Sequence, residues 1–316
     1  MEVLAALRAP GLIPNPALGE ELLADGSVPA LIFMTGEEHR VHRRVVAPPF
    51  SRRQLSSLEP QIRRYAQEAI AQLLPDDAPR RVRLGDEFAW PLVKRTFSSL
   101  LGLCGQQIED LIPLGRGIIS NDLSPLRKRL AALRLYKAVT ALVDKRSAPD
   151  GVVERLKHAS TPTGDIVGAV MTMLVSGATL SVRGLLGCIS ASVGQDENPV
   201  ALDNHELDDL LSECPIVRTV ERVAIEETRL GSNPVPPGSR VKIVVAGPHA
   251  ADQPSVPFGI GPHYCLGAPL IHSLCRAALG ILTTTVTLSD CEPTHSSSDY
   301  PFGGVVEVIA TAQRKR

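Results

Sequence analysis

The change of hydrophobic period near Val217 constrains the fold more than any other feature of this chain. Between Arg52 and about Leu74, apolar residues recur every three or four positions, which is the period of an amphipathic helix. Shorter patterns of the same period cover Trp90–Leu103 and Ser124–Lys145. The chain before Val217 is therefore predicted to be helical.

Beyond Val217 the pattern moves towards period 2. Val220, Arg222 and Ala224 alternate as in a strand, and Arg240–Val245 is a second candidate strand between turn-forming Gly and Pro residues. A last helix is predicted over about Pro269–Leu282. Since no internal repeat or Gly/Ser linker divides the chain, we expect one domain over residues 1–316, mainly α with a small β region (α+β).

The longest helical candidate, residues 164–193, has an uncharged stretch from Ile166 to Val182. That stretch is 17 residues long, whereas a membrane span usually needs roughly 20. It also contains Gly168 and Gly177, and small residues let another group approach a helix backbone closely. We therefore expect a helix through the centre of a soluble domain, and no contact with a membrane.

Composition excludes several classes of partner and compartment. A net charge of -1 gives no overall attraction to nucleic acid, and 3% aromatic residues are too few for base-stacking platforms. The six cysteines have no regular spacing, and the start of the chain lacks the order of a secretion signal. The sequence therefore predicts a reduced, cytoplasmic protein without a nucleic-acid partner.

The segment Phe258–Pro269 carries the strongest chemical signal. Its glycines at 259, 261 and 267 can adopt backbone angles closed to other residues, and so direct several N–H groups at the sulfur of Cys265. Pro269 lies where a helix can begin. A thiol at a helix N-terminus among N–H donors is stabilised as the thiolate. With no neighbouring base, such a thiolate suits metal ligation better than attack on a carbonyl.

The run F-G-x-G-x-H-x-C-x-G resembles the heme-binding loop of the cytochrome P450 family. Every defining position is filled, by Phe258, Gly259, Gly261, His263, Cys265 and Gly267. The resemblance implies a cytochrome P450-like fold, abbreviated at its N-terminus, that binds heme b (iron protoporphyrin IX). It implies Cys265 as the iron ligand and His263 as a contact of a heme propionate, with Phe258 and Gly267 in the cofactor site.

Two other interpretations of the loop stay open. A cysteine can fall in a Gly-rich loop without any function. The set His263, Cys265, His272 and Cys275 also contains the residue types of a zinc site, although the H-x-C spacing is unusual for structural zinc and no C-x-x-C pair is present.

Two further segments resemble propionate-binding parts of the same family. Met34–Arg44, followed by Phe50, resembles its heme-contacting helix, in which His39 and Arg43 are one helical turn apart. The segment around Arg222 resembles the strand whose Arg also reaches a propionate. The alternative for His39 and Arg43 is an ordinary solvated basic face of a helix.

The distal helix departs from the family pattern A-G-x-[DE]-T, whose acid and alcohol relay protons to bound dioxygen. The corresponding catalytic positions are Gly177, Ala178, Thr179, Leu180 and Ser181. Gly177 keeps the close approach to heme that the resemblance implies. Thr179 stands at the acid position and Leu180 at the alcohol position, and Leu180 cannot donate a hydrogen bond. Thr179 or Ser181 are the possible substitutes.

The helical E-x-x-R ion pair, which braces the thiolate loop in the family, is also missing. The corresponding stretch Asp208–Glu213 contains no basic residue, and no Arg lies between Lys242 and Arg276. His249 is the remaining candidate for a third member. We therefore expect that the bracing network has been lost as a unit, which leaves no single buried charge unpaired.

The resemblance begins late, because Val3–Arg8 already matches the family's second helix. The strand Arg240–Val245 would then lack its usual neighbours, and such an edge favours a homodimer or a partner protein. In the family, basic residues on the thiolate side of the heme bind a ferredoxin or flavodoxin. The resemblance implies that the corresponding residues here are Arg52, Arg53, Arg63 and Arg64.

The resemblance also implies where the substrate-lining loops lie. They are expected near Pro14–Ala30, Leu84–Trp90 and Ile118–Leu126.

Three functions follow from the resemblance. The first is a monooxygenase-type heme-thiolate oxidoreductase that acts on a small organic molecule, in the biosynthesis of a specialised metabolite. The second is a heme enzyme that uses peroxide, or that catalyses a redox-neutral rearrangement, dehydration or cyclisation. The third is a non-catalytic auxiliary protein that stabilises a partner enzyme.

Overall fold

The computed structural model describes residues 2–16, 30–120, 123–192, 204–214, 216–245, 256–296 and 302–315. The α-helices are α1 (Glu2–Arg8), α3 (Gly36–Val46), α4 (Arg52–Ser56), α5 (Glu59–Leu73), α6 (Trp90–Leu101), α7 (Gly105–Ile119), α8 (Pro125–Val143), α9 (Val152–His158), α10 (Thr163–Thr172), α11 (Ala178–Ser192), α12 (Asn204–Glu213) and α13 (Ala268–Thr285). The strands are β1 (Leu12–Pro14), β2 (Arg80–Arg83), β3 (Thr219–Ala224), β4 (Thr228–Leu230), β5 (Asn233–Val235), β6 (Arg240–Val244), β7 (Val286–His295) and β8 (Val305–Arg314). The predicted class, mainly α with a small β region, is confirmed.

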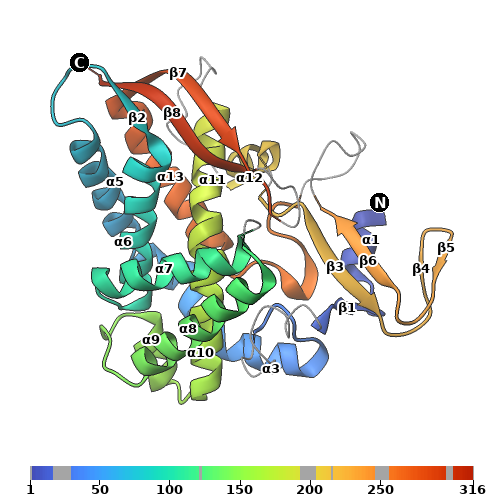
Figure 1. Cartoon of the computed structure of the whole chain (residues 1–316). Coiled ribbons are helices and arrows are strands. Elements are labelled where there is room, and N and C mark those ends of the chain that lie inside the picture. The colour runs from blue at the N-terminus through green and yellow to red at the C-terminus, as the bar shows by residue number, and fades with distance from the viewer. Residues whose placement is uncertain are drawn as a thin grey trace.

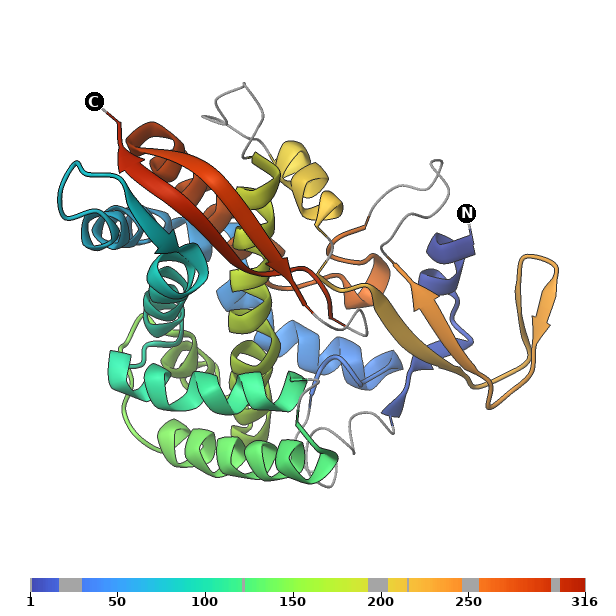
Figure 2. The same ribbon diagram turned by 45° about the horizontal axis from the view of Figure 1, so that its top comes forward.

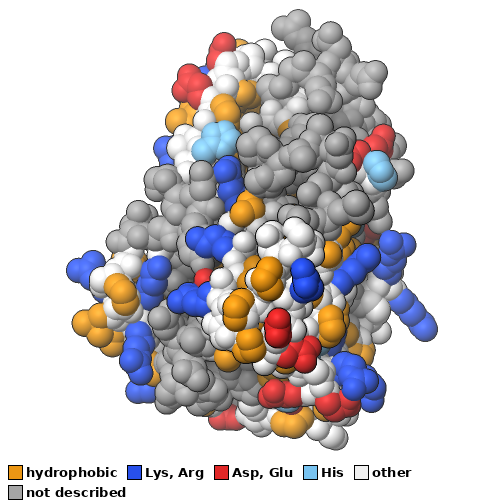
Figure 3. Space-filling view, turned by 90° about the vertical axis from the view of Figure 1, so that its right-hand side faces the viewer, with side chains coloured by type: hydrophobic (Ala, Val, Ile, Leu, Met, Phe, Trp, Pro, Cys, Tyr) orange, Lys and Arg blue, Asp and Glu red, His pale blue; other side chains and the backbone are white. Residues whose placement is uncertain are grey.

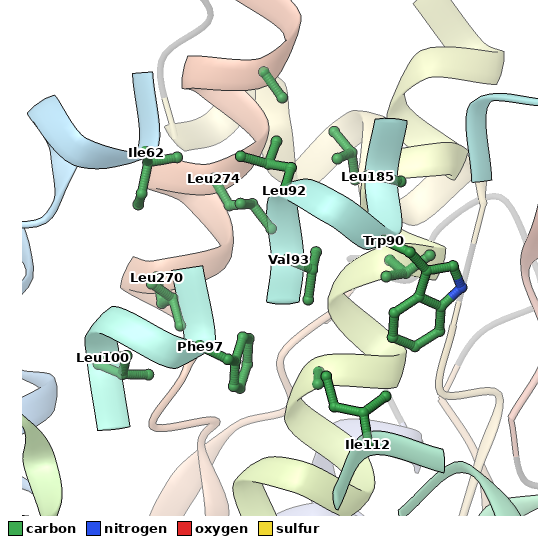
Figure 4. Packing of buried hydrophobic residues seen from close by; sticks show 14 of the residues in the cluster. Ile62, Trp90, Leu92, Val93, Phe97, Leu100, Ile112, Leu185, Leu270 and Leu274 are labelled. Carbon is green, nitrogen blue, oxygen red and sulfur yellow. The ribbon is translucent and has the colours of Figure 1, made fainter. Parts of the chain in front are cut away.

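Helix α11 runs through the middle of the helical part, with α6, α7, α12, α13 and β8 packed around it (Figures 1 and 2). Its contacts with these elements belong to one large cluster of buried apolar side chains. Figure 4 shows part of this cluster, including Trp90, Val93 and Phe97 of α6, Ile112 of α7, Leu185 of α11, and Leu270 and Leu274 of α13. Burial of this apolar surface is the main force that holds the helices together.

The strands form small antiparallel sheets on two sides of the helices (Figure 1). One sheet has the order β1-β3-β6, with Leu12 opposite Ala224 and Arg222 opposite Val241. Another has the order β2-β8-β7, and β4 pairs with β5. The pair β7–β8 was not predicted. Most of β7 is exposed, and its ladder with β8 shifts register after Ser289 and again after Thr294, so its sequence shows no regular alternation.

The helical candidate 164–193 is confirmed as α10 and α11, joined by one π-helical turn, η3 (Met173–Gly177). Among the described residues, Thr163–Ser192 is the one helix long and apolar enough to cross a membrane. Of its most apolar window, 61% is buried inside the protein, as in the core helix that the sequence predicts.

Two local predictions differ from the structure. The helix expected from Arg52 to Leu74 is divided into α4 and α5, because the hydroxyls of Ser56 and Ser57 bind back to the Arg53 and Gln54 carbonyls, and Pro60 lies in the first turn of α5. The prediction of a substrate loop over Leu84–Trp90 is wrong. Residues 85–89 form a π-helical turn, and Phe88 is fully buried in the core.

Strand β6 is at an edge of its sheet within the described part of the chain, as expected, but β1 completes the other edge by pairing with β3. Figure 3 shows the side of the molecule that carries this sheet, where cationic and apolar side chains are exposed next to one another. An interface along β6 stays a prediction, and the expected substrate segment 17–29 lies outside the described residues.

Candidate functional site

The loop around Cys265 leads directly into α13, and its backbone is fixed by local hydrogen bonds. The Cys265 N–H donates to the Phe258 carbonyl at 3.0 Å, and the Tyr264 N–H donates to the Gly261 carbonyl at 3.0 Å. Gly259 and Gly261 have φ angles of +70° and +75°, so the expected need for glycine is confirmed at both positions. The expected need for glycine is wrong for Gly267, the residue before α13, because its backbone angles are right-handed (φ -82°, ψ -5°).

The environment of the Cys265 sulfur differs in part from the expected one. Backbone N–H groups of Gly267 and Ala268 donate to the sulfur, and the charge of Arg43 also lowers the pKa of the thiol, as expected for a helix N-terminus. Burial is the larger effect, however, and the pKa of Cys265 is raised. The residue as a whole is nevertheless solvent-accessible. A cation bound to the sulfur is needed to hold it as the thiolate.

Four basic side chains from three separate segments gather beside this loop. The rings of His39 in α3 and His263 in the loop have centroids 4.3 Å apart, and Arg43 Nη2 donates to the Tyr264 carbonyl at 2.6 Å. Arg222, in β3, and Arg43 are close enough for their charges to lower the pKa of His263. The structure therefore brings together all four residues for which the sequence predicted propionate contacts.

Within the described part of the chain, no compensating acid accompanies this basic cluster, which is defined as His39, Arg43, Arg222 and His263. Among the described residues, no carboxylate contributes to the pKa shift of any of the four. His39 is buried, and its Nε2 atom has no hydrogen-bond partner in the described part of the chain. An unpaired buried polar atom and uncompensated half-buried cations are unfavourable unless an anion is bound. A ligand with carboxylates at one edge and a metal ion within reach of Cys265 fits these residues.

The basic cluster predicts how the stability of the ligand-free protein depends on pH. Burial, with the charges of His39, Arg222 and Arg43, lowers the pKa of His263 to about 4 from its ordinary value of 6.5. The unfolded chain therefore binds more protons than the folded one between these values. We expect the free energy of unfolding to fall as the pH is lowered from about 6.5 to about 4. Urea titrations at several pH values give the slope of the free energy of unfolding against pH. This slope should be shallower in His263→Gln than in the wild type, and unchanged in the exposed-site control His205→Gln. A slope in His263→Gln equal to that of the control would contradict the prediction.

The five distal positions lie at the start of α11 and the end of the π-turn. A Cβ atom on Gly177 would be 3.2 Å from the Phe97 ring, so the close approach seen here is to Phe97 of α6. Ala178 and Thr179 are buried, and the Thr179 hydroxyl has no hydrogen-bond partner among the described residues. The Ser181 hydroxyl donates to the Gly177 carbonyl at 2.6 Å. Leu180 is half-exposed, and residues 166–192 contain no acid.

The stretch Asp208–Glu213 contains no basic residue, as expected, but Asp208 has a basic partner in another helix. Asp208 Oδ1 in α12 is 2.8 Å from His272 Nε2 in α13. His272 is buried, and its ring lies edge-on to Phe258, with centroids 5.1 Å apart. Among the described residues no group of three His, Cys, Asp or Glu side chains could hold a metal ion, so the zinc interpretation is not supported. His249 lies outside the described residues.

Sequence reasoning missed two histidine–carboxylate pairs near the site. One is Asp208–His272, and the other joins His42 Nδ1 in α3 to Asp165 Oδ1 in α10 at 2.8 Å. Both connect segments far apart in the chain, so no local spacing indicates them. The available signal was only that His272 lies on the apolar face of the predicted last helix.

Comparison with known proteins shows which proteins this chain is similar to. No family model matches the chain. It is 23% identical over 306 residues to cytochrome P450 107B1 of Saccharopolyspora erythraea, an alignment that covers 88% of this chain and 72% of that protein. It is 26% identical over 285 residues to vitamin D(3) 25-hydroxylase of Pseudonocardia autotrophica, with 80% and 70% covered.

Solved structures share the fold at lower sequence identity. P450BioI, in a complex with an acyl carrier protein ligated to hexadec-9Z-enoic acid, has a TM-score of 0.84 at 16% identity, with 98% of this chain and 90% of that chain covered. Cytochrome P450 TxtC, described as hydroxylating thaxtomin, has a TM-score of 0.82 at 19% identity, with 98% and 91% covered.

Proposed function

We propose that the chain, which is similar to bacterial cytochromes P450 in sequence and fold, is a heme-thiolate monooxygenase of that family acting on a small organic molecule in the biosynthesis of a specialised metabolite. The observation that carries the proposal is the convergence of the Cys265 loop with the basic cluster. Several relatives are named as hydroxylases or monooxygenases, among them mycinamicin VIII C21 methyl hydroxylase of Micromonospora griseorubida.

Each side chain of the site has a distinct task in this proposal. Heme b, when bound, supplies the activation of an oxidant. Cys265 would ligate the iron, whose charge would hold the sulfur as a thiolate, while the Gly267 and Ala268 N–H groups donate to that sulfur. His39, Arg43, Arg222 and His263 bind the two propionates, whose charges compensate the cluster. Phe258 positions the Cys265 backbone through its carbonyl.

A second candidate, favoured by the distal helix, is a reaction with peroxide or without an oxidant. Proton delivery needs a donor that can exchange with an acid or with water. The Ser181 hydroxyl is committed to the Gly177 carbonyl, and Thr179 is the one buried hydroxyl at these positions without a partner in the described residues. Since Leu180 cannot donate, the usual relay is absent, and peroxide brings its own protons.

The Leu180→Thr variant tests this difference. We expect a hydroxyl at this half-exposed position to raise activity with dioxygen and a reductant, and to lower the relative activity with peroxide. Turnover of one substrate with each oxidant should be compared in the wild type, Leu180→Thr and the control Leu180→Val. If neither activity changes in the Thr variant, Leu180 does not stand where proton delivery is decided.

The electron donor in this proposal is a ferredoxin or flavodoxin. Arg52 and Arg53 are exposed, and the charge of Arg52 acts on Tyr264 beside Cys265, which supports a docking surface next to this loop. Arg63 and Arg64 are less available, since they pair with Glu59 and Glu68 of the same helix.

Turnover with a reduced surrogate ferredoxin tests the monooxygenase function. Product that forms only with the reductant and dioxygen supports it. Product without a reductant supports the second candidate, and absence of heme from the purified protein supports an auxiliary role instead.

A further inference from the structure

We propose that Asp208 and His272 form a substitute brace that positions the Cys265 loop, in place of the E-x-x-R ion pair that this chain lacks. The inference rests on the proposed heme-thiolate function. Both residues act through others, so they are positioning residues and do not touch the reacting groups.

The brace is a continuous series of contacts from α12 to Cys265. Asp208 Oδ1 and His272 Nε2 are hydrogen-bonded at 2.8 Å, which ties α12 to α13. The His272 ring lies edge-on to the ring of Phe258, at an interplanar angle of 87°. The Phe258 carbonyl accepts the hydrogen bond from the Cys265 N–H at 3.0 Å. A displacement of His272 therefore changes the position of the residue whose carbonyl holds Cys265.

The protein encloses the His272 end of the pair. The His272 side chain is 9% exposed and that of Asp208 is 40% exposed, so the carboxylate stays hydrated while the ring is enclosed. Leu207 and Leu211 fix α12 on either side of Asp208, since both are buried in the core. A buried hydrogen bond to a charged group contributes more than an exposed one.

The same helix provides a matched control. His205 and Asp209 form a second histidine–carboxylate pair at 3.0 Å, with side chains 84% and 67% exposed. This pair joins two residues of α12 one turn apart. Replacement of Asp209 thus removes the same kind of contact from the same helix without disturbing the series that leads to Cys265.

The first measurement needs no heme. Amide hydrogen exchange at Cys265 reports on its N–H bond to Phe258 in the ligand-free protein. We expect Asp208→Ala and His272→Ala to increase this exchange rate about tenfold or more. Asp208→Asn, which keeps an acceptor, should increase the rate less, and Asp209→Ala should leave it unchanged. Equal rates in Asp208→Ala and the wild type, or an equal increase in Asp209→Ala, would overturn the proposal. If His272→Ala does not fold, the exchange rate in Asp208→Ala decides the test, because Asp208 is the half-exposed member of the pair.

The second measurement uses the heme-loaded protein. In Asp208→Ala, part of the thiolate-type absorption of the reduced CO complex should be replaced by the thiol-type band, and the reduction potential should shift. The spectrum and potential of Asp209→Ala should equal those of the wild type. An unchanged spectrum and potential in Asp208→Ala would also overturn the proposal. If the wild type binds no heme, the proposed function fails, whereas the exchange experiment still decides whether the brace holds the loop.

Discussion

Cys265→Ser is expected to abolish the thiolate-type absorption of the reduced CO complex while the protein stays folded. The Ser hydroxyl is not ionised near neutral pH, so it cannot replace the thiolate as an anionic ligand of iron. The fold should tolerate the change, because the residue is solvent-accessible and the Gly267 and Ala268 N–H groups can donate to a hydroxyl oxygen as they do to sulfur. Optical spectra and urea titrations of the same preparation measure both quantities.

Cys104→Ser is the control for this variant, since Cys104 is an exposed cysteine that is far along the chain from the loop, at the start of α7. Its spectrum should match that of the wild type. Retention of the thiolate-type band in Cys265→Ser would show that another residue ligates the iron. Loss of the band together with the fold would show that Cys265 is needed for folding, and the change in spectrum could then not be assigned to ligation.

Gly115→Ala is expected to destabilise the protein by about 1–3 kcal/mol, although Ala favours helices over Gly. Helix α7 crosses the π-turn at Gly115, and a Cβ atom there would lie 2.6 Å from the Leu174 carbonyl oxygen and 2.9 Å from its carbon. These are backbone atoms of the distal helix, so α7 itself must move away. Urea titration gives the change in the free energy of unfolding.

Gly117→Ala, two residues later in the same helix, is the matched control. Its Cβ atom would meet only side-chain atoms, at 3.4 and 3.6 Å, which is ordinary van der Waals contact. We expect this variant to be unchanged or more stable by up to about 1 kcal/mol, from helix propensity alone. If the two variants unfold at the same urea concentration, the close approach of α7 to Leu174 is not a constraint on the fold.

The parts of the site that could be predicted are those encoded by local spacing. The Cys265 loop is contiguous, and His39 and Arg43 are one helical turn apart, so each forms a pattern that can be recognised without knowing the fold. That Arg222 would join them came from the resemblance, which carries information about contacts between distant segments. The need for glycine at 259 and 261 followed from backbone physics alone and is confirmed.

The parts that could not be predicted depend on packing between distant segments. His272 and Asp208 are 64 residues apart, and a histidine on an apolar helix face gives no sign of its partner. The pKa of Cys265 was expected to fall because the N–H donors were counted without the burial that the fold imposes. Segment 84–90 was expected from the resemblance to be a substrate-lining loop, yet residues 85–89 form a helical turn and the core encloses Phe88.

The optical spectrum of the purified, reduced protein with and without CO tests the central claim most directly. With heme supplied, a thiolate-type CO band is expected in the wild type. A protein that stays colourless after addition of hemin, or one whose CO complex shows only the thiol-type band, would contradict the assignment of Cys265 as an iron ligand.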